Sequence, residues 1–139
     1  TLESHFVHII GLEHKKALVV EDDESNAILI EKYLRKLKFS VGIVKNGIDA
    51  VDKFKSVDYD IIIMDLGLPL MNGIEATKAI RELETETGSH IPIIALTAHA
   101  YELDKSNCLK AGMDDYLAKP LDVKLLNEKI MKLAENPAQ

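Results

Sequence analysis

Residues 61–69 read IIIMDLGLP: four apolar residues run into the carboxylate of Asp65, and a proline follows four residues later. A continuous apolar run of this length is typical of a strand that is buried on both faces of a parallel sheet. A carboxylate at the end of such a strand needs partners, because an unpaired charge there would cost several kcal/mol. Asp65 therefore predicts a group of polar side chains at one edge of a sheet.

Other apolar runs have the same character, and amphipathic segments separate them. The runs lie at about 17–21, 41–44, 91–96 and 115–118, and the run that contains Asp65 covers 60–65. Alternating helices and continuous apolar strands predict an α/β fold in which both faces of a parallel sheet are covered. Right-handed crossovers make this a doubly wound (βα)5 sandwich, in which ligands bind beyond the carboxyl ends of the strands.

The segments between the strands carry apolar residues at helical spacing. These stripes consist of Ala27, Ile30, Leu34 and Leu37; Ile48, Val51 and Phe54; Ile74, Thr77, Ile80 and Leu83; and Leu126, Ile130 and Leu133. Residues 100–110 make a weaker helix, which Gly112 is expected to end. Asp122 is expected to cap the last helix.

The composition fits a single domain at 16–134, with an N-terminal extension or linker at 1–15 and a C-terminal tail at 135–139. The net charge of −6 argues against a nucleic-acid surface, which needs a basic stripe. The single cysteine, Cys108, allows no internal disulfide and fits a reducing compartment. No apolar run approaches the ~20 residues that span a bilayer. We therefore expect a cytoplasmic segment without direct contact to membrane or nucleic acid.

Polar residues at the strand ends suit one metal and phosphoryl site. Glu21 and Asp22 follow the first strand and Asp65 ends the third, while Thr97 and Lys119 follow the fourth and fifth. Parallel neighbouring strands would bring these groups to the same edge of the sheet. Carboxylate oxygens suit a hard cation such as Mg2+, and crowded acids need a cation or an ammonium group to offset their repulsion.

Other interpretations of the acidic loop at 21–23 fit these residues less well. Asp23 is explained more simply as a helix cap than as a ligand. An EF-hand at 22–26 lacks the glycine of the sharp turn, and the chain contains neither G-x-x-x-x-G-K-[ST] nor G-x-G-x-x-G. Three acids after the first strand would repel the phosphate ester of a flavin. We therefore expect the phosphoryl group to be attached to a carboxylate.

Four segments resemble the receiver domain of two-component response regulators and hybrid histidine kinases. In chain order they are LVVEDD (18–23), IMDLGLPLMNG (63–73), IIALTA (93–98) and GMDDYLAKP (112–120). The resemblance covers about residues 16–134, and it is strongest to receivers attached to hybrid sensor kinases. It implies a flavodoxin-like fold with a five-stranded parallel sheet in the order 2-1-3-4-5.

The resemblance implies a role for each acidic residue of the site. Asp65 would be the phosphoacceptor. Asp22 and Asp65 would bind Mg2+ directly, together with the backbone carbonyl of Gly67. Glu21 stands where aspartate is more frequent and would reach the metal through water.

The resemblance also implies how the phosphoryl group is recognised. Thr97 would donate a hydrogen bond to it, and Lys119 would pair first with Asp65 and then with the phosphate. Tyr116 would turn inward on activation, and the Lys119–Pro120 peptide bond would be cis. Gly67 and His99 occupy two variable positions that would influence hydrolysis of the phosphoaspartate.

The implied function is a receiver that takes a phosphoryl group from a phosphohistidine and then changes its interactions with partners. The partners would be a histidine kinase domain, a histidine phosphotransfer domain or both, and the segment could be the cytoplasmic part of a membrane-bound sensor kinase. It would catalyse its own phosphorylation and dephosphorylation without being a conventional enzyme. Because only 135–139 follow the last helix, output is expected through a partner or another domain.

Two alternatives stay open at this point. One is a degenerate receiver that acts only as a binding scaffold. The other is a small metal-dependent phosphatase, which would need a second acid two residues beyond Asp65, where Gly67 stands.

Overall fold

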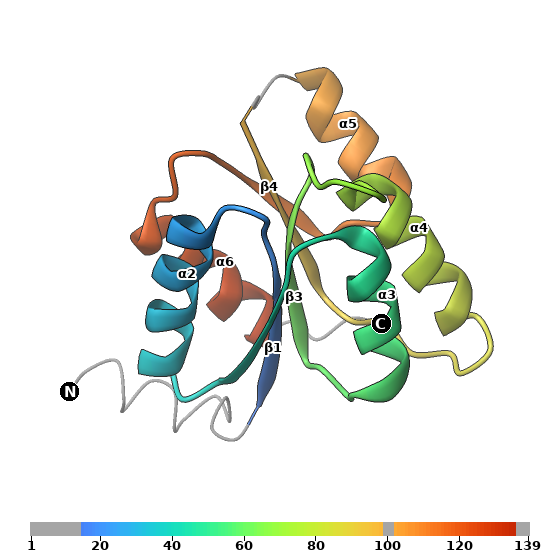
Figure 1. Ribbon diagram of the computed structural model, residues 1–139, viewed down its shortest axis with the longest axis horizontal. Helices are drawn as coiled ribbons and strands as arrows, with labels where there is room; N and C mark the ends of the chain where they lie inside the picture. Colours follow the sequence, from blue (N-terminus) through green and yellow to red (C-terminus); the bar gives the residue numbers. More distant parts are fainter. Residues whose placement is uncertain (1–14, 99–101, 136–139) are drawn as a thin grey trace.

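A computed structural model describes residues 15–98 and 102–135 of the chain, in which strands and helices alternate (Figure 1). The strands are β1 (Lys16–Val20), β2 (Ser40–Val44), β3 (Ile61–Asp65), β4 (Ile93–Thr97) and β5 (Asp115–Ala118). The helices are α2 (Glu24–Lys36), α3 (Gly47–Ser56), α4 (Gly73–Glu84), α5 (Glu102–Ala111) and α6 (Val123–Glu135). All strand pairs are parallel and the order is β2-β1-β3-β4-β5, which confirms the predicted doubly wound sheet.

Two apolar layers cover the sheet, because successive side chains of each strand point to opposite faces. On one face Ala17 and Ile63 pack with residues of α2 and α6, and on the other Leu18 and Ile62 pack with residues of α3, α4 and α5. Figure 1 shows the same division of the helices into two layers. The central strand β3 is buried along its whole length, as its unbroken apolar sequence predicts.

The helix starts are fixed by short polar side chains. Asp23, Asn46 and Asn72 are the N-caps of α2, α3 and α4, and each accepts a hydrogen bond from a backbone N–H three residues later. Asp122 accepts from the backbone N–H groups of residues 124 and 125, and this confirms the expected cap of α6. Gly112 follows α5 with a φ of 105°, as expected for a glycine that ends a helix.

The strand boundaries lie within two residues of the sequence-based expectation, but one residue of a helical stripe was assigned wrongly. Ile48 was expected to face the core of α3, yet it is 44% exposed. Val51 is buried and Phe54 packs against the core, as expected, and the other buried residues of α3 are Gly47 and Ala50. The reason lies in Gly47, whose backbone N–H donates to the carbonyl of Met71 and brings that side of the helix against the β3–α4 connection.

The remaining expectations concern the termini and the start of α5. The described part of α5 covers Glu102–Ala111, and the expected start at 100 lies outside the described residues. His99, the extension at 1–14 and the tail at 136–139 lie outside the described residues. Within the part of the chain that the structure describes, no helix has the length and apolar character needed to cross a membrane.

Candidate phosphorylation site

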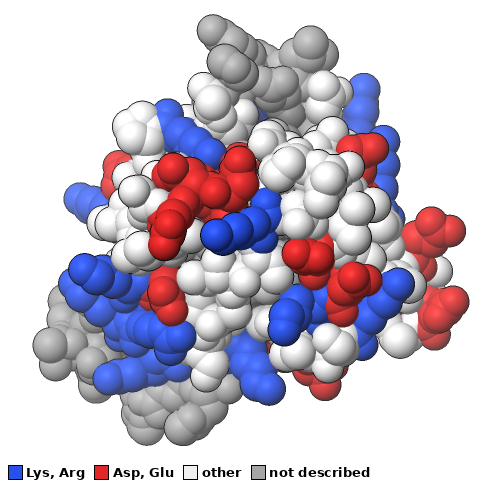
Figure 2. All heavy atoms as spheres, in the orientation of Figure 1, with Lys and Arg blue, Asp and Glu red and all other residues white. Residues whose placement is uncertain are grey.

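Strand register brings the acidic residues together at the carboxyl edge of the sheet. Val20 pairs with Met64, so Glu21 and Asp65 follow on neighbouring strands, and the backbone N–H of Glu21 donates to the carbonyl of Val44 at 3.0 Å. Carboxylate oxygens of Glu21, Asp22 and Asp65 lie within 4.8 Å of one another. Figure 2 shows acidic side chains gathered where α2 begins, beside a basic side chain. The sequence-based grouping of the three acids is therefore correct.

Lys119 reaches this cluster from the end of β5, at the same edge of the sheet. Its Nζ lies 3.1 Å from Oδ1 of Asp65 and 3.3 Å from Oε1 of Glu21. Thr97 pairs with Ala118 in the β4–β5 ladder, and the backbone N–H of Lys119 donates to the carbonyl of Thr97 at 2.8 Å. The Lys119–Pro120 peptide bond is cis, as the resemblance implies. The residues that were expected at the end of β5 and β4 are thus at the same edge as Asp65.

Burial makes the charges of this cluster interdependent. Glu21 is fully buried and Asp65 is 4% exposed, whereas Asp22 faces solvent. Burial and, to a smaller extent, the neighbouring Asp65 carboxyl together raise the pKa of Glu21 from 4.5 to about 7, against the lowering effects of Asn26 and Lys119. Burial also lowers the pKa of Lys119, but its hydrogen bond and charge interaction with Asp65, and those with Glu21, outweigh this and leave the pKa above its usual 10.5. The three carboxylates of the cluster are faced by a single ammonium group, that of Lys119, among the described contacts.

One oxygen of Glu21 has no hydrogen-bond partner among the residues that the structure describes. Oε1 accepts from the side-chain amide of Asn26 at 3.0 Å and from Lys119, while Oε2 is buried and has no such partner among the described residues. An orphaned carboxylate oxygen beside two further carboxylates fits a hydrated divalent cation, because such an ion keeps several waters and takes oxygen ligands. Asn26 was missed as a site residue by the sequence analysis, which considered it only within an EF-hand.

Of the two glycines near Asp65, only Gly73 is required by close packing. The backbone N–H of Gly67 donates to Oδ1 of Asp65 at 3.3 Å, and a Cβ at Gly67 would meet nothing within 4 Å. Gly73 is different, because a Cβ there would lie 2.4 Å from the carbonyl oxygen of Asp65. Gly73 therefore allows the start of α4 to pack directly against the end of β3.

Tyr116 lies on β5 beside the site rather than in it. Tyr116 pairs with Ala95 of β4, and Thr97 lies two residues after Ala95 on the same face of that strand. The side chains of Tyr116 and Thr97 therefore project from the same face of the sheet. The Tyr116 ring is half-buried, and the Nζ atoms of Lys105 and Lys129 lie 5.3 and 5.6 Å from its centroid. This placement is compatible with the predicted coupling between Thr97 and Tyr116.

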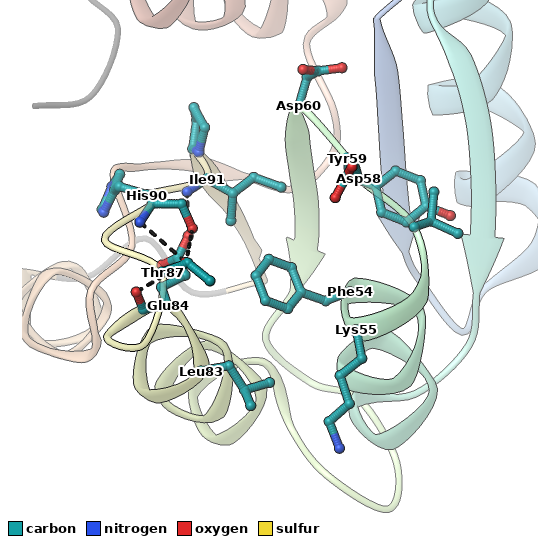
Figure 3. A pocket seen from close by; sticks show the side chains of 13 residues that line it. Phe54, Lys55, Asp58, Tyr59, Asp60, Leu83, Glu84, Thr87, His90 and Ile91 are labelled. Atoms are coloured by element: carbon teal, nitrogen blue, oxygen red, sulfur yellow. Dashed lines mark hydrogen bonds between the residues drawn. The ribbon is translucent and has the colours of Figure 1, made fainter.

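A hollow of about 480 Å³ lies at the opposite edge of the sheet, and Figure 3 shows it from close by. It is lined by residues that precede β3 and β4, such as Asp60 and Pro92, and Phe54 of α3 projects between the two connections. Glu84 beside it accepts the backbone N–H of Ile91. The hollow is distant in the fold from the acidic cluster, and it contains no comparable group of metal ligands among the described residues.

A charged network that the sequence analysis did not anticipate lies near this hollow. Arg81 donates to Glu84 at 2.6 Å, to Asp114 at 2.9 Å and to the carbonyl of Gly112 at 2.8 Å. His90 lies 2.7 Å from Asp114, and Glu84 is 4% exposed. The residues of this network come from separate segments of the chain, so their contacts cannot be predicted from spacing. The sequence shows only that Glu84 continues the buried side of α4. The network fixes α4 to the start of β4 and β5.

Comparisons with known proteins agree with the fold. The response regulator receiver domain profile matches residues 17–131. A hybrid signal transduction histidine kinase I of Dictyostelium discoideum is 49% identical over 121 residues, which are 84% of this chain and 7% of that relative. The chain therefore spans only a small part of the curated relatives that it matches.

Two solved structures are similar over nearly the whole chain. The receiver domain of a sensor histidine kinase from Pseudomonas aeruginosa, with magnesium coordinated in its active-site cleft, is 43% identical with a TM-score of 0.79, and the match covers 88% of this chain and 98% of that one. The receiver domain of the Saccharomyces cerevisiae response regulator Ssk1, in complex with the histidine phosphotransfer protein Ypd1, has 36% identity and a TM-score of 0.85, with coverage of 91% and 93%.

The sheet order, the acidic cluster and these matches define a doubly wound signalling domain. The chain belongs to the response regulator receiver domain family, and among its relatives are receiver domains of hybrid histidine kinases. This confirms the resemblance found in the four sequence segments.

Proposed function

We propose that this domain accepts a phosphoryl group from a phosphohistidine onto Asp65, with Mg2+ bound beside it. The proposed functional unit is residues 16–134. The observation that carries the proposal is the position of Asp65. Its carboxylate is nearly buried, lies 3.1 Å from the Lys119 ammonium and belongs to a cluster of three carboxylates. A carboxylate held in this way is a nucleophile with a cation beside it.

Asp22 and Asp65 would hold the cation directly, with the carbonyl of Gly67, and Glu21 would hold it through a bound water. The orphaned Oε2 of Glu21 and the excess of negative charge support this donor set. When bound, Mg2+ supplies positive charge to the oxygens of the transferring phosphoryl group. The magnesium in the Pseudomonas aeruginosa receiver domain is consistent with the same use of the site.

The chain's own residues account for the transfer step. An oxygen of Asp65 forms a bond to phosphorus, the phosphorus–nitrogen bond of the donor breaks, and its electron pair returns to the imidazole nitrogen. Lys119 then balances charge on the phosphoryl oxygens in place of the carboxylate that it contacts now. Gly67, two residues beyond Asp65, has no side chain to act as a general acid, so the geometry offers no support for a phosphatase.

Partners would approach through the opening beside Lys119. A hollow of about 330 Å³ there is lined by Asn26, Ile30, Leu96, Ala98, Lys119, Pro120 and Leu121. The nearby helix α2 exposes Ile28 and Leu29, at 45% and 44%. An exposed apolar patch next to a charged site suits a protein that must dock to deliver its phosphohistidine. The candidates are a histidine kinase domain and a histidine phosphotransfer domain, the class to which Ypd1 belongs.

Output would depend on Thr97 and Tyr116. Movement of Thr97 toward the phosphoryl group would free space on the face that it shares with Tyr116, and the ring would turn inward. The surface formed by α5, β5 and α6 would change as a result.

The experiment that tests the proposed function is incubation with acetyl phosphate and Mg2+, followed by intact mass measurement. We expect one phosphoryl adduct on the parent protein and none on Asp65→Asn. An adduct that persists in Asp65→Asn contradicts the assignment, and the absence of any adduct on the parent would favour the binding scaffold.

A further inference from the structure

Asn26 contacts the acidic cluster from the first turn of α2, and no role has yet been given to it. Its side-chain Nδ2 donates to Oε1 of Glu21 at 3.0 Å, and the contact is partly buried. Asn26 also lines the 330 Å³ hollow beside Lys119. It therefore lies between the cluster and the opening through which a phosphodonor would come.

The helix cap holds the backbone of Asn26 in place and leaves its side chain free for another partner. Oδ2 of Asp23 accepts the backbone N–H of Asn26 at 3.0 Å. In a capping box, the side chain three residues after the N-cap accepts a hydrogen bond from the backbone N–H of the cap residue. Glu75 does this at the start of α4, where it accepts from the backbone N–H of Asn72 at 3.0 Å. Asn26 holds the same position in α2, but its side chain reaches Glu21.

This contact has a consequence for Glu21. The two hydrogen bonds to Oε1, from Asn26 and from Lys119, fix the carboxylate of a fully buried residue. Oε2 is thereby left as the oxygen without a hydrogen-bond partner in the described residues. A fixed carboxylate with one unused oxygen is prearranged for a ligand that brings its own hydrogen-bond donors, and a water on a cation is such a ligand.

We propose that Asn26 is a positioning residue for the divalent cation: it holds Oε1 of Glu21 so that Oε2 is kept for a cation-bound water. The inference rests on the proposed function, because it assumes that the acidic cluster binds Mg2+. Groups that orient metal ligands in this way typically change metal affinity by about 10- to 100-fold when they are removed. For a ligand that acts through water we expect the lower end of that range.

Asn26→Ala isolates this contact. Alanine keeps the backbone N–H that Asp23 accepts, so the cap of α2 remains and only the bond to Glu21 is lost. Ser25→Ala is a matched control, since Ser25 lies in the same helical turn and is exposed. Mg2+ affinity is measured by titration calorimetry at one pH. The free energy of unfolding without metal and the carboxyl carbon chemical shift of Glu21 in EDTA are measured in parallel.

The expected result is Mg2+ affinity about 10-fold weaker in Asn26→Ala, with parent-like affinity in Ser25→Ala and a changed Glu21 carboxyl shift without metal. With acetyl phosphate, the Mg2+ concentration for half-maximal phosphorylation should rise by the same factor, while the rate at saturating Mg2+ stays within about twofold.

Affinity within about twofold of the parent overturns the role of Asn26 and leaves the proposed function intact. A rate at saturating Mg2+ that falls as far as the affinity also overturns it, because the side chain would then act on the reaction itself. A parent protein that binds Mg2+ no better than Asp22→Ala overturns both the inference and the proposed function.

Discussion

Glu21→Gln should make the metal-free domain less sensitive to pH. Burial raises the pKa of Glu21 to about 7 from 4.5, so the folded state favours the protonated carboxyl. The favourable contribution of this group is complete below the unfolded pKa of 4.5 and is lost as the pH rises through about 7. Glutamine has a similar shape and does not titrate, so the variant should not lose this part of its stability.

The magnitude follows from the two pKa values. A shift from 4.5 to about 7 corresponds to at most about 3 kcal/mol, at about 1.4 kcal/mol for each pKa unit. Part of that difference is already lost at about pH 5.5, which leaves about 2 kcal/mol between about pH 5.5 and about pH 8. The stability of the parent should therefore fall by about 2 kcal/mol more than that of Glu21→Gln over this interval.

Urea unfolding in EDTA at the two pH values measures this difference, and titrations of groups remote from Glu21 cancel in it. Glu24→Gln is the control for the same substitution elsewhere, because Glu24 is an exposed acid in the first turn of α2 and lies outside the group of three carboxylates. If parent and Glu21→Gln lose stability equally with rising pH, the buried environment inferred for Glu21 is wrong.

Three further variants test other parts of the structure. Arg81→Met should lower the free energy of unfolding by about 3–5 kcal/mol, because it leaves the buried Glu84 unpaired, whereas Arg35→Met at an exposed pair should cost less than about 1 kcal/mol in the same urea titration. Asp22→Ala should abolish Mg2+ binding in calorimetry while the metal-free protein becomes no less stable, since repulsion among the acids falls; unchanged Mg2+ affinity would contradict this site. Thr97→Ala should still accept phosphate, yet amide chemical shifts of residues 105–118 should respond little to beryllofluoride, and shifts as large as in the parent would refute the coupling to Tyr116.

The parallel, doubly wound sheet and the acidic cluster were predictable because they depend on local patterns, whereas the order of the strands was implied by the resemblance to receiver domains. The apolar run before Asp65 identifies a central strand, and the parallel arrangement then determines that Glu21 and Asp65 lie at one edge. Gly112 and Asp122 were also recognised from local sequence, since ending and capping a helix involve residues near one another in the chain.

Contacts between distant segments were less accessible. Arg81 contacts both Glu84 and Asp114, which lies 33 residues after Arg81, and no spacing in the sequence indicates the second pairing. Ile48 was placed in the core because it continues a helical stripe, while the close packing of Gly47 against Met71 turns the helix another way. Asn26 was missed because a side chain at the third position of a helix usually serves its own cap.

The most direct test of the central claim is to locate the phosphoryl group chemically. The domain is treated with acetyl phosphate and Mg2+, reduced with borohydride, which converts an acyl phosphate of aspartate to homoserine, and digested for peptide mass spectrometry. The account predicts homoserine at position 65 alone, dependent on Mg2+ and absent in Asp22→Ala. Homoserine at another acidic residue, or a phosphoryl group that borohydride does not remove, would contradict it.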